Sequence, residues 1–267
     1  MNFWSFSMSF ASFRQRLQGV ALAVGVIAGL AAAPAQAELS SAQRSEIEGV
    51  IKDYLMKNPD VIREVLTEME RRQKADEESA RVKAVTDLAP QLFDSSRQAV
   101  LGNPNGKITL VEFFDYNCGY CKKALDDVAK LLKAEPDLRL VIKDFPVLGP
   151  GSVEAAEIAT AMRNQAKGDK YWQYHTKLLT TRGQIGKTQA LAAAKELGAD
   201  MDRLARDAAS AETRASLQEV MMIADRLQLS GTPTFVLGDE VIVGAVGQED
   251  LRARIGNLRK CGKTACG

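Results

Sequence analysis

Apolar residues recur at spacings of three and four in two short stretches that follow the first forty residues. Each set fits one side of an amphipathic helix, and the two sets are Ile47, Val50, Ile51, Tyr54 and Leu55, then Val61, Ile62, Val65, Leu66 and Met69. Asn58-Pro59 separates them, because asparagine as N-cap and proline at the first helical position begin a new helix. Neither helix can bury its apolar side alone, so we expect either self-association with further copies of the chain or packing onto the rest of it.

The pattern changes beyond these helices. Residues 70–83 are dense in charge and offer little to bury, which predicts a solvated helix or a hinge. Farther on, β-branched and aromatic runs predict buried strands, while helical spacing predicts helices. The expected elements are strands at 108–114 and 138–145, a helix from Cys121 to Leu132, a helical stretch at 152–227, a hairpin at 234–246 and a closing helix at 248–258.

The first 37 residues have the order of a secretory signal. Arg14 and Arg16 precede an uncharged stretch from Leu17 to Ala33, and Ala35-Gln36-Ala37 supplies small residues for a signal peptidase. The alternative is an uncleaved anchor helix, since the uncharged stretch is at the lower limit for spanning a bilayer. Export would place the mature chain in the periplasm, an oxidising compartment where thiol pairs can be oxidised.

The amino-acid composition excludes several classes of protein. Hydrophobic residues make up 46% of the 267 residues and charged residues 26%, with a formal net charge of +1. These values exclude a disordered chain, a polytopic membrane protein and a dedicated nucleic-acid binder. The four cysteines form two close pairs, Cys118 with Cys121 and Cys261 with Cys266, which indicates redox chemistry or metal binding.

Cys118-Gly119-Tyr120-Cys121 lies where a predicted strand meets a helix. This spacing lets the two sulfurs form a disulfide, and the helix dipole with its unpaired N–H groups favours thiolate at Cys118. Cys118 would attack a disulfide and Cys121 would resolve the mixed disulfide. The pair is also half of a zinc site, but no second ligand pair accompanies it, and His175, the single histidine, fits an ordinary helix residue better than a catalytic one.

Glu112 and Pro233 are two further candidate site residues. Glu112 stands inside an apolar strand, where it is either a buried acid with a raised pKa that exchanges protons with the buried thiol, or an acid that strand alternation turns to solvent. Pro233 precedes a predicted strand, and by itself it indicates only a turn.

Residues 111–121 (VEFFDYNCGYC) and 231–235 (GTPTF) resemble the two motifs of the DsbA-like branch of the thioredoxin superfamily, and the resemblance extends over roughly residues 96–256. It implies a thioredoxin fold with a helical insertion at about 149–227. It also implies that Glu112 is the buried proton carrier, that Thr232-Pro233 is cis, and that this loop binds substrate with Gly119 and Tyr120. Gly119-Tyr120 stands where the strongly oxidising family member has proline and histidine, which argues against extreme oxidising strength.

Residues 47–66, which include YLMKNPDV at 54–61, resemble the N-terminal segment of ScsC-type (suppressor of copper sensitivity) proteins. The resemblance implies a homotrimer formed through residues 42–70. It also implies a disulfide isomerase or reductase that acts on mis-disulfided client proteins and receives electrons from a membrane-bound thiol reductant. The alternatives are a monomeric DsbA-like oxidase and a copper-tolerance protein that holds Cu(I) with Cys118 and Cys121; no other cofactor is expected.

Cys261 and Cys266 enclose four residues near the chain end, which predicts a local structural disulfide, with a second redox or metal-holding pair as the alternative. The expected organisation is a signal peptide at 1–37, a helical oligomerisation arm with its linker at 38–95, a DsbA-like thioredoxin domain at 96–260 and a tail at 261–267. The fold class is therefore α/β with an added N-terminal α-helical arm.

Overall fold

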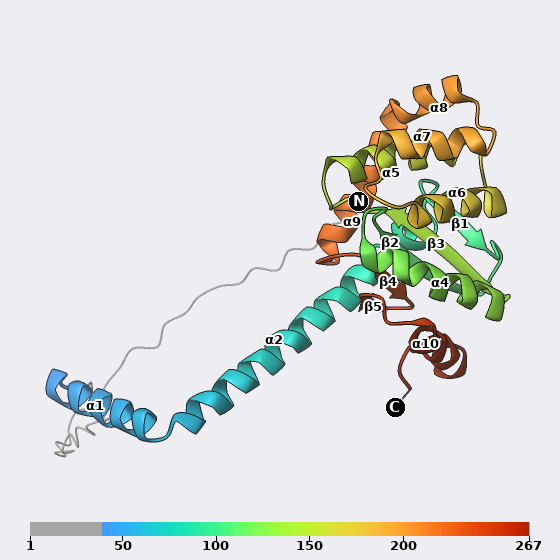
Figure 1. Ribbon diagram of the computed structural model, residues 1–267. Helices are drawn as coiled ribbons and strands as arrows, with labels where there is room; N and C mark the ends of the chain where they lie inside the picture. Colours follow the sequence, from blue (N-terminus) through green and yellow to red (C-terminus); the bar gives the residue numbers. More distant parts are fainter. Residues whose placement is uncertain (1–38, 267) are drawn as a thin grey trace, which may run out of the picture. The chain divides into compact units, whose positions relative to one another are not determined.

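The computed structural model describes residues 39–266, so the predicted signal peptide at 1–37 lies outside the described residues. The chain divides into two units, residues 1–62 and 63–267, and each is considered by itself. Figure 1 labels the helices and strands. Between residues 39 and 266, no helix combines the length and the apolar content that crossing a bilayer requires.

The amphipathic stretches near the N-terminus are helical. Helix α1 (Ser41–Lys57) follows a capping box formed by Ser40, and Asn58 ends it by donating its backbone N–H and its side-chain amide to the Tyr54 carbonyl. Helix α2 (Pro59–Asp87) begins at the proline, as the sequence predicts. The break between the two helices therefore falls at the predicted position.

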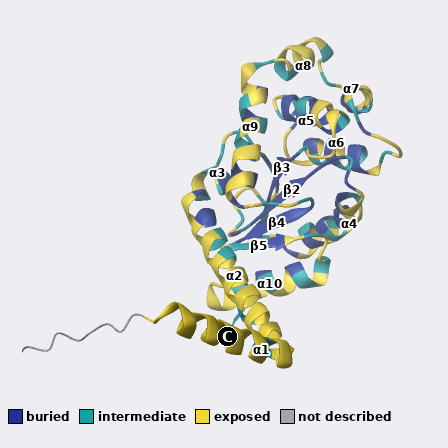
Figure 2. Ribbon diagram, turned by 90° about the vertical axis from the view of Figure 1, so that its left-hand side faces the viewer, coloured by how far each residue is buried: buried dark blue, intermediate teal, exposed yellow. Residues whose placement is uncertain are grey.

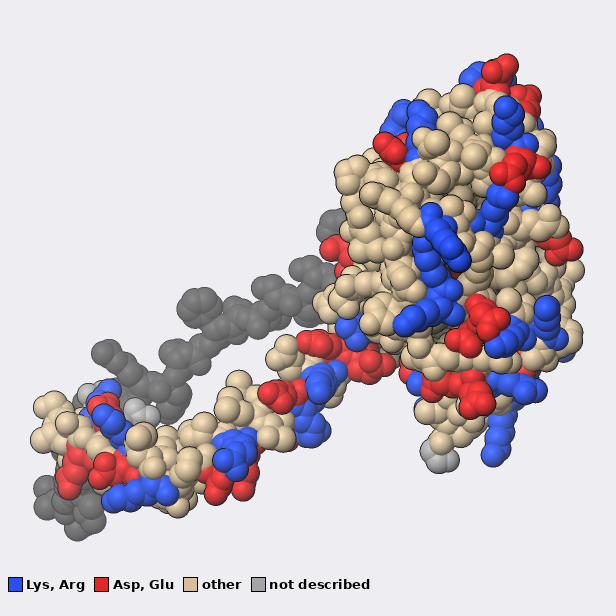
Figure 3. Space-filling view, viewed as in Figure 1, with Lys and Arg blue, Asp and Glu red and all other residues tan. Residues whose placement is uncertain are grey.

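The charged stretch at 70–83 is a solvated helix, since α2 runs through it without interruption. Figure 3 shows basic and acidic side chains interspersed along this helix. Glu68 accepts hydrogen bonds from Arg71 and Arg72, and Lys83 pairs with Asp87 four residues on. Pairs at these spacings favour helix where there is little apolar surface to bury.

Five strands form one sheet in the order β1-β3-β2-β4-β5. They are β1 (Ala99–Gly102), β2 (Ile108–Phe114), β3 (Leu138–Asp144), β4 (Thr234–Leu237) and β5 (Glu240–Val243). The central pair β2 and β3 is parallel, and the other neighbours are antiparallel. This sheet with its helices confirms the α/β class, and β4 with β5 is the predicted hairpin.

Helices cover both faces of the sheet and fill the chain between β3 and β4. They are α3 (Ala89–Phe93), α4 (Gly119–Ala134), α5 (Pro150–Met162), α6 (Gly168–Thr180), α7 (Lys187–Glu196), α8 (Met201–Ala208), α9 (Ala211–Arg226) and α10 (Gln248–Cys261). Helices α5 to α9 are the insertion predicted at about 149–227.

Side-chain alternation along β2 divides the core into two layers. Leu110 and Phe114 join the layer that contains α4, α6 and α10, whereas Val111 and Phe113 join the layer that contains α3 and α9. Figure 2 shows the buried strands between these two groups of helices.

The packed core begins earlier in the chain than the predicted boundary between residues 95 and 96. The end of α2 and all of α3 lie against the sheet, and their buried residues are Ala84, Val85, Leu88 and Leu92. Lys143 of β3 is also buried, and its ammonium donates to the Gln91 carbonyl at 2.7 Å. Residues 84–93 therefore belong to the globular unit, because they cover one face of the sheet.

Candidate functional site

Cys118 and Cys121 lie at the carboxyl end of β2, where the chain turns into α4. Cys118 is the N-cap of α4, and Cys121 lies in its first turn. Both thiols are free; Cys118 is 6% exposed and Cys121 is completely buried. Burial raises the pKa of the Cys121 thiol. Of the two sulfurs, Cys118 is therefore the one that a partner molecule can reach.

The loop before β4 lies against Cys118. The Thr232–Pro233 peptide bond is cis, as the family resemblance implies, and the Cys118 thiol donates to the Thr232 carbonyl oxygen at 3.1 Å. Pairing of Thr234 with Phe113 of β2 holds this loop in place. The Cys118 side chain makes no capping bond to the N–H groups of α4, contrary to the expectation from the sequence, because its thiol is directed to Thr232.

Glu112 is buried on β2, with 3% of its surface exposed. Burial raises its pKa to about 8, because the ionised carboxylate loses its hydration. The pKa of Cys121 is raised first by its burial and to a smaller extent by the negative charge of Glu112. The prediction of a buried acid with a raised pKa is confirmed, and the solvent-facing alternative is wrong; its role as proton carrier stays a prediction.

The two residues between the cysteines are accessible. Gly119 is exposed, and a Cβ at its position would meet nothing within 4 Å. Tyr120 is 65% exposed, and the Lys123 ammonium lies 5.5 Å from its ring centroid. Lys122 instead donates to the Thr181 carbonyl at 3.1 Å. An exposed aromatic ring thus lies between the two cysteines in the sequence.

Sequence reasoning missed a buried polar cluster beside Cys118. It consists of Asp115, Asn117 and Ser152, which hydrogen-bond to one another. The signal that could have found it is the pair of polar residues between an apolar strand and a cysteine, where a turn needs side-chain hydrogen bonds. Ser152, from α5, carries no such signal.

His175 is a core residue of α6. Its Nδ1 lies 3.3 Å from the Tyr116 hydroxyl, and its ring packs edge-on against Phe114 with 4.6 Å between the centroids. Burial lowers its pKa to about 3, because the cationic form would lose its hydration. The imidazole is therefore neutral at physiological pH, as befits an ordinary core residue.

This burial predicts a loss of stability in acid. An unfolded histidine titrates near 6.5 and the folded one near 3, so the free energy of unfolding falls as pH drops from about 6.5 toward 3. At pH 4 the loss due to His175 is roughly 3 kcal/mol. A His175→Phe variant keeps a ring at this site, and urea unfolding at pH 4 and pH 7 should show the difference between the two pH values shrinking by that amount. An unchanged difference would contradict the assignment.

The C-terminal cysteines form a disulfide in the structure. Cys261 is the last residue of α10, and Gly262 follows with a φ of +74°, a left-handed conformation that suits glycine and ends the helix. Asn257 donates its side-chain amide to the Thr264 carbonyl at 2.9 Å. The pair closes a local ring on α10, the arrangement that the predicted structural disulfide requires.

The part of the chain that the structure describes offers no cluster of metal-ligating side chains. No group of three or more histidine, cysteine, aspartate or glutamate side chains there could hold a metal ion. Copper(I) accepts two thiolate ligands, so a Cu(I) ion would depend on Cys118 and Cys121 alone. The Cu(I) site stays a prediction.

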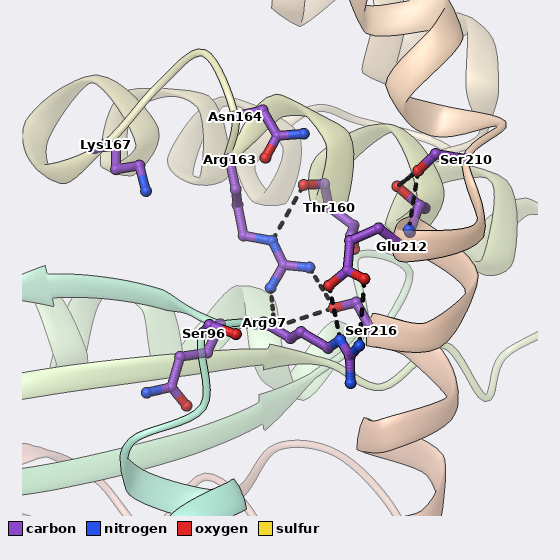
Figure 4. Close-up of a pocket in the computed structure, with 11 residues that line it drawn as sticks. Ser96, Arg97, Thr160, Arg163, Asn164, Lys167, Ser210, Glu212 and Ser216 are labelled. Carbon is purple, nitrogen blue, oxygen red and sulfur yellow. Dashed lines mark hydrogen bonds and ion pairs between the residues drawn. The ribbon is translucent and has the colours of Figure 1, made fainter.

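A polar pocket lies elsewhere in the globular unit, where β1 begins beside α5 and α9 (Figure 4). Arg163 donates to the Arg97 carbonyl and to the Ser216 hydroxyl, both at 2.7 Å, and Arg97 pairs with Glu212 at 2.7 Å. Its lining includes no residue of the Cys118 loop or the Pro233 loop. Both arginines are engaged in these bonds, so the pocket ties β1, α5 and α9 together; the exposed Lys167 also lines it.

Two family models match the chain. The DSBA-like thioredoxin domain matches residues 109–256, which is more than half of the chain, and the copper resistance protein ScsC N-terminal domain matches residues 43–76. The first match includes Cys118, Cys121 and Pro233. Together they confirm the thioredoxin fold with its helical insertion and the resemblance of the N-terminal segment to ScsC.

Known proteins agree with these matches. A thioredoxin-like oxidoreductase from Silicibacter pomeroyi is 40% identical, with a TM-score of 0.61 over 64% of this chain and 98% of its own. A linker-deletion mutant of Proteus mirabilis ScsC has a TM-score of 0.64 at 22% identity, over 84% of this chain and 99% of its own, and shows the fold alone. A Na(+)/H(+) antiporter, NhaA 1 of Salinispora arenicola, is 30% identical over 61% of this chain; the chain spans only 25% of that protein, about a quarter of its length.

Proposed function

The chain belongs to the DSBA-like thioredoxin domain family, and from that premise we propose that it is a thiol–disulfide oxidoreductase that acts on client proteins through Cys118 and Cys121. One observation carries the proposal: the sulfur of Cys118, the more exposed of the two cysteines, lies against the Thr232 carbonyl, next to the cis Pro233. A client segment along this loop would bring its disulfide to Cys118.

The exchange would run in two steps. The Cys118 thiolate attacks one sulfur of a client disulfide, forming a mixed disulfide and releasing the other client sulfur as a thiolate. A different client thiolate then displaces Cys118, which isomerises the client, or Cys121 displaces the client, which reduces it and leaves a Cys118–Cys121 disulfide. Cys121 must lose a proton for its attack, and Glu112, with a pKa of about 8, is suited to accept it through water.

Isomerase or reductase activity is our choice over oxidase activity. Its support is the N-terminal segment, which matches the ScsC N-terminal domain at 43–76. Taken by itself, α1 buries no residue. On the predicted apolar sides of the two helices, the exposed residues, which we call the arm stripe, are Ile47, Val50, Ile51, Tyr54, Ile62, Val65, Leu66 and Met69. A homotrimer formed through residues 42–70 would cover this stripe and place several active sites on one assembly.

The compartment and the redox partner follow from the same proposal. An isomerase needs its active-site pair reduced, so it requires a supply of electrons in an oxidising compartment. We propose the periplasm, reached by the signal at 1–37, with a membrane-bound thiol reductant as partner. The Cys261–Cys266 disulfide supports this compartment, because structural disulfides persist in oxidising surroundings.

Recovery of a scrambled-disulfide ribonuclease tests this function together with the role of the arm. The wild-type protein should restore the enzyme's activity and show three times the chain mass by light scattering. A double variant, Ile51→Asp with Leu66→Asp, places charges on the arm stripe; it should show the mass of one chain and lose roughly fivefold or more in recovery rate.

Glu48→Ser is the matched control, because Glu48 is exposed on α1 outside the arm stripe; it should keep both properties. Deleting the whole predicted arm, residues 38–95, is a poorer test, because the deletion also removes core residues from Ala84 onward. A wild-type protein that is monomeric and does not recover the ribonuclease would contradict the isomerase proposal and leave the oxidase alternative.

A further inference from the structure

The carboxylate of Asp115, three residues before Cys118, is buried and accepts four hydrogen bonds. Its Oδ1 accepts from the Asn117 N–H and from the Ser152 hydroxyl, both at 2.7 Å. Its Oδ2 accepts from the N–H groups of Val147 and Leu148, at 2.9 and 3.0 Å. All four partners are neutral donors, so hydrogen bonds hold the carboxylate in place and an opposite charge does not.

These bonds join the Cys118 loop to the loop between β3 and α5. The backbone carbonyl of Asp115 accepts from the Cys118 N–H at 3.0 Å, so the same residue contacts both loops. Asn117 makes a second connection: its side chain donates to the Ile185 carbonyl at 2.8 Å and accepts from the Ile185 N–H at 2.7 Å. Cys118 is therefore fixed relative to a segment before the insertion, at Val147 and Leu148, and a segment within it, at Ile185.

The loop that Asp115 holds presents apolar side chains to solvent. Leu148 is 50% exposed and Val147 is 41% exposed, although their N–H groups are both bonded to the buried carboxylate. Tyr120 adds an exposed ring from the other side of Cys118 in the sequence. One residue, Asp115, thus bonds both the Cys118 N–H and the loop that carries two large exposed apolar side chains, and such side chains mark an interaction surface.

We propose that Asp115 is a positioning residue that sets client specificity, by holding Val147 and Leu148 beside Cys118 as a wall for apolar residues next to a client cysteine. The occupant is an extended client segment, because exchange at Cys118 requires a client disulfide to come directly to this place. The inference rests on the proposed function and names the class of client that this site prefers.

A carboxylate suits this place better than its amide analogue. Four donors converge on Asp115, and two acceptor oxygens with two lone pairs each receive them all. An asparagine offers one oxygen and one NH₂ group, so two of the donors would face a donor. Asp115→Asn should therefore release the Val147–Leu148 loop or the Asn117 turn while changing the side-chain volume little.

The test compares three reagents that react with reduced full-length protein. They are glutathione disulfide, a peptide disulfide with leucine beside each cysteine, and the same peptide with serine in place of leucine. Second-order rate constants are measured by acid quench and mass spectrometry. The wild-type protein should react about tenfold faster with the leucine peptide than with the serine peptide. Burial of part of the leucine side chain against the wall stabilises the encounter by enough to account for a factor of this size.

Two variants should lose this preference. Leu148→Ser removes an exposed side chain and does not threaten folding, and its ratio between the two peptides should fall to about 2. Asp115→Asn should lower the same ratio. Met221→Ser, at an exposed apolar residue of α9, is the matched control and should keep the wild-type ratio.

The outcomes separate the two proposals. A wild-type protein that reacts with none of the three reagents would contradict the proposed function itself. A wild-type protein that reacts with all of them but does not distinguish the peptides would overturn the specificity inference alone. The inference also fails if both variants keep the wild-type ratio, or if Asp115→Asn slows all three reactions equally, because Asp115 would then serve only Cys118.

Discussion

A Cys118→Ser variant is expected to lose exchange with client disulfides by roughly a thousandfold or more, the scale of loss seen when an enzyme's nucleophile is removed. A serine hydroxyl does not ionise near neutral pH, and it forms no disulfide. The other free thiol cannot substitute, because Cys121 is completely buried and its pKa is raised by that burial. The reduction of insulin, followed by turbidity with a dithiol as electron donor, measures the loss.

The chain supplies a matched control for this experiment. A double variant, Cys261→Ser with Cys266→Ser, removes the other pair of cysteines and should reduce insulin within twofold of wild type, since that pair closes a ring on α10. A Cys121→Ser variant should instead accumulate mixed disulfides with clients, because nothing resolves them. Activity that survives in Cys118→Ser would remove the basis of the assignment.

Glu112→Gln is expected to stabilise the protein by roughly 3 kcal/mol at pH 7. The folded carboxyl has a pKa of about 8 and the unfolded one about 4.5, so the folded state holds a proton that the unfolded state has released. The free energy of unfolding of the wild type therefore falls as pH rises from about 4.5 to about 8. Glutamine resembles the protonated acid and does not titrate, so the variant escapes this loss.

Urea unfolding at pH 4, 7 and 8.5 measures the effect. The two proteins should be equally stable at pH 4, and the variant should gain as pH rises. Glu70→Gln, at an exposed acid of α2, should change stability by less than about 0.5 kcal/mol at every pH. The same Glu112→Gln variant should resolve mixed disulfides more slowly, because no carboxylate receives the proton of Cys121. Equal stabilisation at all three pH values would show that the gain is not due to ionisation.

Much of the fold could be predicted because its signals are local. The strand at 108–114 is a β-branched and aromatic run in which Glu112 is the one acid, and the structure places β2 over the same residues. The packing of residues 84–92, where the predicted arm joins the globular unit, could not be predicted in the same way. Residues 84–92 follow a charged stretch, and their few apolar residues matter only because the sheet face with Val111 and Phe113 needs a cover. The predicted boundary at residue 96, where the family resemblance begins, therefore lies after the first residues that pack on the sheet.

The candidate site likewise has a part that the sequence predicts and a part that it does not. The two cysteines and Glu112 lie close in the sequence, and the family motif adds Pro233. The bonds of Asp115 join residues more than thirty positions apart, and no local pattern predicts that Ser152 and the backbone of Val147 meet one carboxylate. The direction of the Cys118 thiol likewise depends on a carbonyl 114 residues away. Such contacts exist only once the sheet has formed.

The closed ring at the end of α10 has a practical consequence for titrations of this protein. With Cys261 and Cys266 joined, the reactive inventory of each chain is one dithiol, Cys118 with Cys121. An equilibrium titration against a glutathione buffer should then follow a two-electron curve with a single midpoint. After acid quench and unfolding, which expose the buried Cys121, an alkylating reagent should add two labels per chain when the active site is reduced and none when it is oxidised. The number of labels alone would report the redox state of the active site inside the cell.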